Sequence, residues 1–166
     1  MRVLGIDPGS VSSGYGIVDE EGSALFFVEA GGIAASSKLA FPDRLHKIYN
    51  GYRDVIERHR PDFVSIESLF FAKNVQSALK LGQARGVALL AAVTSSIPIF
   101  EYSASEIKQS VVGYGQAEKA QVQQMVKALL KLESVPKPHD ASDAIAAAIC
   151  HIHSARMKEA VTRARG

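Results

Sequence analysis

The sequence contains one cysteine, and this scarcity excludes several kinds of site. With Cys150 alone, the chain forms no internal disulfide and builds no zinc site from thiolates. Cys150 stands in an apolar helical stretch, where a buried and unreactive thiol is expected. The five histidines do not show the spacing of a zinc motif either. Zinc chemistry based on thiolates and histidines is therefore not indicated.

Long hydrophobic runs are missing too. The longest, residues 86–93, falls far short of the roughly 20 residues that a membrane-spanning helix needs. The first residues lack the pattern of a secretory signal peptide, so we expect a protein of the reducing cytoplasm with no membrane partner. Its 166 residues are 47% hydrophobic, which suffices for one domain with a sizeable core. We predict this domain over residues 1–154, followed by a flexible tail at residues 155–166.

Charge is divided unevenly along the chain. Residues 1–67 carry 7 Lys and Arg against 10 Asp and Glu, whereas residues 68–166 carry 12 against 7. A basic C-terminal part is typical of a protein that binds a polyanion such as nucleic acid. An accidental distribution of surface charge would give the same numbers, so charge alone does not decide the partner.

The hydrophobic pattern predicts an α/β domain. Three strands joined by short turns form an antiparallel meander, and a helix then leads to a fourth strand that is parallel to the first. The expected elements are strands at residues 3–6, 14–18, 24–33, 63–67 and 97–101, and helices at 42–60, 75–93, 105–112, 117–132 and from 139 onward. The prediction is a five-stranded mixed sheet flanked by helices.

Two of these helices have faces with more than one interpretation. The helix at residues 75–93 is apolar nearly all round in its second half, so it should be buried on more than one side. Its small residues would let a second subunit approach closely, and burial within the monomer fits equally well. The helix at residues 117–132 shows Lys119, Lys127 and Lys131 on one face, which suits a phosphate backbone but is also common on a solvated helix.

Carboxylates stand at the ends of several elements. Asp7 ends the first strand before a Pro-Gly turn, and Glu67 ends the parallel strand. If these strands are neighbours, their ends lie about 5 Å apart, and two anions that close need a proton or a cation between them. Asp140 and Asp143 lie one turn apart at the start of the last helix, where helix capping alone would also explain them. A site made of carboxylates suits a hard divalent ion, and two such ions can drive phosphodiester hydrolysis without a side-chain nucleophile.

Taken in order, these stretches resemble the RuvC family of Holliday junction resolvases over roughly residues 2–153. The resemblance rests on Ile6-Asp-Pro-Gly-Ser10 with Gly14-Tyr-Gly16, Ile66-Glu67, Phe70-x-Ala-Lys-Asn74, Ser77–Gly86, Val111-Val-Gly113, Ala117-Glu-Lys119 and Asp140-Ala-Ser-Asp143. It implies a ribonuclease-H-like α/β fold. It also implies a homodimer that cuts two strands of a four-way DNA junction symmetrically in recombination and repair, working with the RuvA–RuvB branch-migration machinery.

The resemblance also implies roles for single residues. Asp7, Glu67, Asp140 and Asp143 match the family's catalytic, metal-binding acids, which would hold two Mg²⁺ per subunit, with Mn²⁺ as a substitute. Some members of the family have histidine at the third of these positions, whereas this chain has a carboxylate. His139 is not part of the family pattern.

The predicted DNA contacts form a second set. In the family, the position of Phe70 carries an aromatic that stacks on unpaired bases, and the positions of Lys108 and Lys119 carry lysines near the scissile phosphate. The full set of predicted DNA-binding residues is Phe70, Lys73, Lys80, Arg85, Lys108, Lys119 and Lys127.

Two other functions remain open at this point. The Asp-Pro-Gly-Ser turn also resembles the phosphate loop of actin-like ATPases and sugar kinases, although 166 residues hardly hold the second domain that those proteins close over their nucleotide. A junction-binding module without catalysis is the other alternative, and the four intact acids argue against it.

Overall fold

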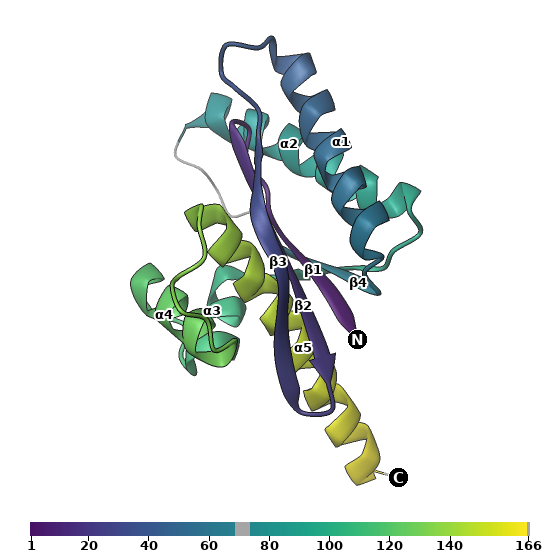
Figure 1. Cartoon of the computed structure of the whole chain (residues 1–166), viewed down its shortest axis with the longest axis vertical. Coiled ribbons are helices and arrows are strands. Elements are labelled where there is room, and N and C mark those ends of the chain that lie inside the picture. Colours follow the sequence, from purple (N-terminus) through teal and green to yellow (C-terminus); the bar gives the residue numbers. More distant parts are fainter. Residues whose placement is uncertain (69–73, 166) are drawn as a thin grey trace.

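In the residues that the structure describes, five strands form a single mixed sheet with helices on both faces (Figure 1). The structure is a computed structural model and describes residues 1–68 and 74–165. The elements are β1 (Arg2–Asp7), β2 (Ser12–Glu21), β3 (Ala24–Ala34), α1 (Phe41–His59), β4 (Phe63–Glu67), α2 (Val75–Thr94), β5 (Ile99–Tyr102), α3 (Ala104–Val112), α4 (Lys119–Leu129) and α5 (His139–Arg165).

The strands lie in the order β3-β2-β1-β4-β5. The first three are antiparallel to one another, whereas β4 is parallel to both β1 and β5. Helix α1 leads from the end of β3 back to the end of the sheet at which β1 begins. Strand β4 therefore starts beside the start of β1 and runs in the same direction. The predicted mixed sheet and the ribonuclease-H-like class are confirmed.

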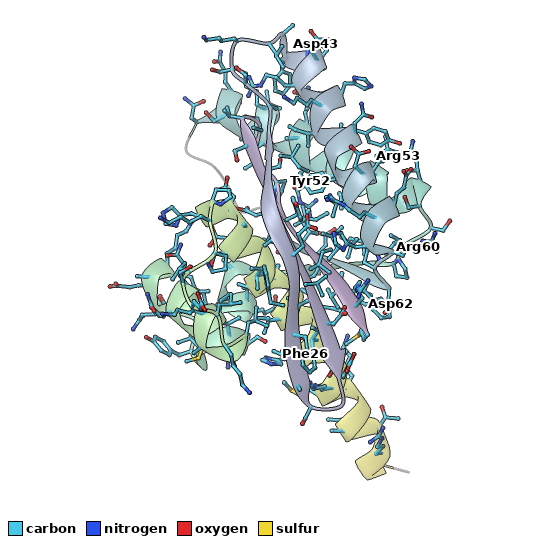
Figure 2. All side chains as sticks on the ribbon, viewed as in Figure 1. Phe26, Asp43, Tyr52, Arg53, Arg60 and Asp62 are labelled. Atoms are coloured by element: carbon cyan, nitrogen blue, oxygen red, sulfur yellow. The ribbon has the colours of Figure 1, made fainter. Side chains whose placement is uncertain are left out.

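Each face of the sheet has its own apolar layer. On one face α5 packs against β1 and β2, with α3 and α4 outside it, and the fully buried Ile145, Ile149 and Ile152 form the centre of that layer. On the other face α1 and α2 cover the sheet, and Tyr52 is fully buried between α1 and the strands (Figure 2). None of the helices in the described ranges is long and apolar enough to cross a lipid bilayer.

Several predicted boundaries are wrong by a few residues. The strand expected at 97–101 is Ile99–Tyr102, and the helix expected at 117–132 ends at Leu129. Lys131 therefore lies beyond α4, with a positive φ of 53°, and does not extend the basic face of that helix. The structure has no break at Ser154, because α5 continues to Arg165 past the end of the sheet (Figure 1). Flexibility of residues 155–166 stays a prediction.

The expectation that α2 is buried on more than one side is also wrong for the single chain. Its buried residues are the alanines of one narrow face, Ala84, Ala88, Ala91 and Ala92. Leu90 and Val93, in the second half, remain 50% and 62% exposed. The apolar pattern predicted a helix correctly but overestimated how much of it the monomer covers.

Candidate active site

Asp7 stands at the end of β1, where the chain enters a braced turn. The Ser13 hydroxyl donates to the Gly9 carbonyl at 2.8 Å and accepts from the Gly9 amide at 3.0 Å, which closes the turn on itself. The buried guanidinium of Arg44, on α1, donates to the Ser10 carbonyl. The turn is thus held from two sides, and Asp7 at its start is fixed at the edge of the sheet.

Glu67 ends the neighbouring parallel strand at the same edge. Ile6 pairs with Ile66 in the β1–β4 register, so the residues that follow them, Asp7 and Glu67, leave the sheet side by side. The next amide, that of Ser68, donates to the Tyr102 carbonyl of β5 at 2.8 Å. This bond continues the sheet to the last residue before the undescribed segment and holds Glu67 in place.

Asp140 and Asp143 reach this edge from the first turns of α5. The main chain of Asp140 lies against Gly14, which is the β2 partner of Asp7. Deeper in the layer, the buried Ser65 of β4 donates to the Ala147 carbonyl at 2.6 Å, which fixes α5 against the sheet. The helix therefore brings both carboxylates to the strand ends that carry Asp7 and Glu67.

The pKa values of the acids show that these charges interact. The pKa of Asp7 rises from 3.8 to about 7, first because the group is buried and then because Asp143, Asp140 and Glu67 add negative charge nearby. Burial also raises the pKa of Glu67, with a further contribution from Asp143, while Lys108 and Lys119 oppose the increase. All four predicted acids thus gather in one region, which the sequence alone left conditional on the strand order.

Two predicted lysines face the same region. Lys119, the first residue of α4, places its Nζ 2.5 Å from a carboxylate oxygen of Asp143, and this hydrogen bond raises the pKa of Lys119. Lys108 comes from α3, which begins with a capping box between Ser103 and Glu106. Both lysines line a pocket of about 320 Å³ whose other lining residues are Glu67, Ala104, Ile107, Val122, Asp143 and Ala146.

The remaining predicted DNA contacts lie in different settings. Lys80 is exposed on α2 and Lys127 is partly buried on α4. Arg85 does not stand free, because its guanidinium forms an ion pair with Glu101 at 2.5 Å and its side chain is only 13% exposed. Phe70 and Lys73 lie outside the described residues.

A larger pocket, of about 690 Å³, lies between the C-terminal end of α4 and the β2–β3 hairpin. Figure 2 labels Phe26 on this hairpin. Its lining contains no carboxylate. Its polar lining residues are Ser23, Lys131, His153 and Arg156. Because this pocket offers no carboxylate to a hard cation, we place the candidate active site at the acidic edge instead.

In the structure, the four acids are not arranged as a complete metal-binding site. Within residues 1–68 and 74–165, no group of three or more His, Cys, Asp or Glu side chains is arranged so that it could hold a metal ion. The donor set nevertheless fits a hard cation. It consists of carboxylate oxygens, it is partly buried, and it carries mutual repulsion that a divalent ion would relieve.

Comparison with known proteins identifies the family. The family model described as "Crossover junction endodeoxyribonuclease RuvC" matches residues 3–151. A protein of that name from Geobacter sp. strain M21 is 56% identical over 157 residues, which are 95% of each chain. The chain belongs to the RuvC family.

Solved RuvC structures agree with this assignment. The structure of Thermus thermophilus RuvC has a TM-score of 0.88 at 34% identity and covers 95% of this chain and 97% of its own. The same enzyme in complex with a Holliday junction substrate has a TM-score of 0.90 at 33% identity and covers 95% and 96%. The chain is therefore an endonuclease of the RuvC type, and the expected resemblance is confirmed. The ATPase and non-catalytic alternatives find no support.

Sequence reasoning missed the residues that shape this edge without carrying charge. The sequence predicts Gly14 as the first residue of a strand and as part of the Gly14-Tyr-Gly16 stretch, but its contact with Asp140 depends on the tertiary structure. The same holds for Arg44, which reads as an ordinary polar residue of an amphipathic helix. Neither contact has a signal in the local sequence.

Proposed function

We propose that this RuvC protein is a metal-dependent endonuclease that resolves four-way DNA junctions. The observation that carries the proposal is the convergence of Asp7, Glu67, Asp140 and Asp143 at one edge of the sheet, beside Lys108 and Lys119. A polyanionic substrate needs its charge neutralised near the reacting phosphate, and the two lysines supply positive charge on the same pocket.

The four carboxylates would hold the metal ions, which we propose to be two Mg²⁺ with Mn²⁺ as a substitute. When bound, such ions would supply activation of a water molecule and stabilisation of the leaving oxygen of a phosphodiester. The chain itself contributes the fixed positions of Asp7 and Glu67 on the strands and of Asp140 and Asp143 on α5. In the metal-free chain, Lys119 partly offsets the charge of Asp143.

We further propose that two copies of the chain associate through α2. Along one side of this helix, large apolar side chains are exposed, with Val75 at 73%, Leu79 at 63% and Val93 at 62%. Between them, Gly82 and Gly86 leave open space where a side chain would stand. A stripe of this kind supports a homodimer with close helix contact, and two active sites would match the two strands that symmetric resolution cuts.

The wider setting follows from the proposed substrate. Junctions in chromosomal DNA would place the protein in the cytoplasm, and we expect it to act with the RuvA–RuvB branch-migration machinery. Lys80, Lys127 and the undescribed Phe70 and Lys73 remain proposed DNA contacts. Arg85 would have to leave Glu101 before it could contact a phosphate.

The experiment that tests this function compares the wild type with Asp7→Asn on a labelled four-way junction, with and without Mg²⁺. Asp7→Asn should lower the cleavage rate by about 10³-fold or more, because metal ligation is lost, while junction binding in the absence of metal stays intact. Equal loss of binding would show that Asp7 is structural, and cleavage without a divalent ion would refute the metal mechanism.

A further inference from the structure

The first turn of α5 lies over two paired glycines on neighbouring strands, Gly14 of β2 and Gly32 of β3. In the β1–β2 register Asp7 pairs with Gly14, and in the β2–β3 register Gly14 pairs with Gly32. At the level of the active site, three neighbouring strands therefore carry one acid and two glycines. The acid lies on the face that α5 covers, because strand alternation places it on the same side as Gly5, whose added Cβ would overlap the main chain of Ala144 on α5.

The main chain of α5 fills the space that these glycines leave. A Cβ added to Gly14 would overlap the carbonyl of Asp140 and come within 2.8 Å of the Asp140 Cβ. A Cβ added to Gly32 would lie 2.9 Å from the Cγ of Pro138, just before the helix begins. The start of α5 thus rests directly on the backbone of β2 and β3.

A hydrogen bond from the other face of the sheet restrains β2 from moving away from the helix. The hydroxyl of the fully buried Tyr52, on α1, donates to the Gly14 carbonyl at 3.1 Å. An extra methyl group on Gly14 would therefore be accommodated by movement of the Asp140 main chain away from the sheet. That movement would also take the Asp140 carboxylate away from Asp7.

We propose that Gly14 is a positioning residue for the metal site, and that Gly32 supports it through Pro138. The missing side chain of Gly14 sets the height of Asp140 above the sheet and hence the separation of the Asp140 and Asp7 carboxylates. The inference rests on the proposed function, because it assumes that these acids bind the metal together.

Gly16 provides a matched control on the same strand and the same face. A Cβ added there would lie 2.5 Å from the Cγ1 of Ile145 and 3.0 Å from the Ile145 amide nitrogen. Its nearest neighbour is a side-chain atom one turn further along α5, which can repack. Gly16→Ala should therefore lower the stability of the fold without moving Asp140.

The test measures Mn²⁺ binding directly, by electron paramagnetic resonance titration of the purified full chain. Gly14→Ala should weaken Mn²⁺ binding by about ten-fold or more, as disturbed supporting contacts do at other metal sites. Gly32→Ala should weaken it less, since only the ring of Pro138 has to move, and Gly16→Ala should leave it within about two-fold of the wild type. Thermal unfolding of all three variants separates metal affinity from general stability.

Two results would overturn the positioning role alone: unchanged Mn²⁺ affinity in Gly14→Ala, or an equal loss in Gly14→Ala and Gly16→Ala. If Gly14→Ala does not fold, Gly32→Ala decides between the same outcomes against Gly16→Ala. Asp7→Asn serves as the reference. If it binds Mn²⁺ as tightly as the wild type, the proposed metal site fails, and the positioning role fails with it.

Discussion

The helices α5 and α2 are both apolar and rich in small residues, yet they use them in opposite ways. The middle of α5 is buried nearly all round, between the sheet on one side and α3 and α4 on the other. The fully buried residues of α2 are the alanines of one narrow face. Val87 and Leu89 are partly buried beside them, whereas Val75, Leu79, Leu90 and Val93 are exposed. Hydrophobicity alone therefore does not tell which helix belongs to the core and which leaves apolar side chains exposed.

The difference lies in where the glycines are. Beneath α5 they belong to the strands, at Gly5, Gly14 and Gly16, and they let the helix backbone approach the sheet. On α2 they belong to the helix itself, at Gly82 and Gly86, where added side chains would meet only open space. The strand glycines let α5 bring its carboxylates close to the strand ends. The glycines of α2 leave open space on the surface of that helix, with room for the backbone of another helix.

The burial of α5 gives the largest expected effect on stability. Ile149 is fully buried, so Ile149→Ala should lower the free energy of unfolding by about 2–5 kcal/mol through lost burial and a residual cavity. On the same helix Met157 is 67% exposed, and Met157→Ala should change it by less than about 0.5 kcal/mol. Urea denaturation of both variants checks this, and similar losses would mean that the two parts of α5 are equally packed.

The exposed stripe of α2 gives the next largest effect. Leu79→Glu should weaken dimerisation by about 100-fold or more, because a charge would be buried in an apolar contact. Met157→Glu is a matched control, since Met157 is as exposed as Leu79 but lies on α5. Analytical ultracentrifugation over a concentration series measures both. A dimer that survives Leu79→Glu, or dissociates with Met157→Glu, would place the interface elsewhere.

The four acids at this edge should make the stability of the metal-free protein depend on pH. Because the pKa of Asp7 is raised from 3.8 to about 7, the folded state holds this proton more tightly than the unfolded state, and stability falls as the pH rises between those values. Asp7→Asn removes this loss. At pH 8 it should stabilise the metal-free chain by about 1 kcal/mol or more, which raises Tm by roughly 2–4 °C per kcal/mol.

Two comparisons make that prediction specific. Near pH 4 the variant and the wild type should unfold at similar temperatures, because Asp7 is then protonated in the fold. Saturating Mg²⁺ should stabilise the wild type and not Asp7→Asn. Calorimetry at three pH values, with and without metal, measures these differences, and a variant that is less stable than the metal-free wild type at pH 8 would contradict the proposed repulsion.

The smallest expected effect concerns the outer lysines. Lys127→Ala on α4 should reduce the salt dependence of junction binding by about one unit of log–log slope or less, as expected for one lost phosphate contact. Lys47→Ala provides the control, since Lys47 is exposed on α1 across the sheet. Fluorescence anisotropy at several salt concentrations gives both slopes, and equal slopes would return Lys127 to the solvated surface.

Much of the fold could be predicted because its signals are local. Strand alternation, the proline at the start of α1 and the amphipathic face of α4 each depend on a few neighbouring residues. The strand–helix–strand rule then placed Glu67 beside Asp7. Helix α2 shows what local signals do not predict. Its apolar face would have the same sequence whether the core of the monomer or a second subunit covers it.

The charged residues of the candidate site could be predicted from the sequence, whereas the uncharged residues that position them could not. Four acids at element ends are visible in the sequence, whereas the seat of Asp140 on Gly14 arises only when α5 meets β2. The ion pair of Arg85 with Glu101 likewise joins two elements whose contact no local pattern indicates. Contacts of this kind, between segments far apart in the sequence, could not be predicted from local patterns.

The most direct test of the central claim is anomalous diffraction from crystals soaked in Mn²⁺. We expect manganese peaks between the carboxylates of Asp7, Glu67, Asp140 and Asp143, with movement of Lys119 away from Asp143. Peaks bound elsewhere, or no peak at a Mn²⁺ concentration that supports cleavage in solution, would contradict the account.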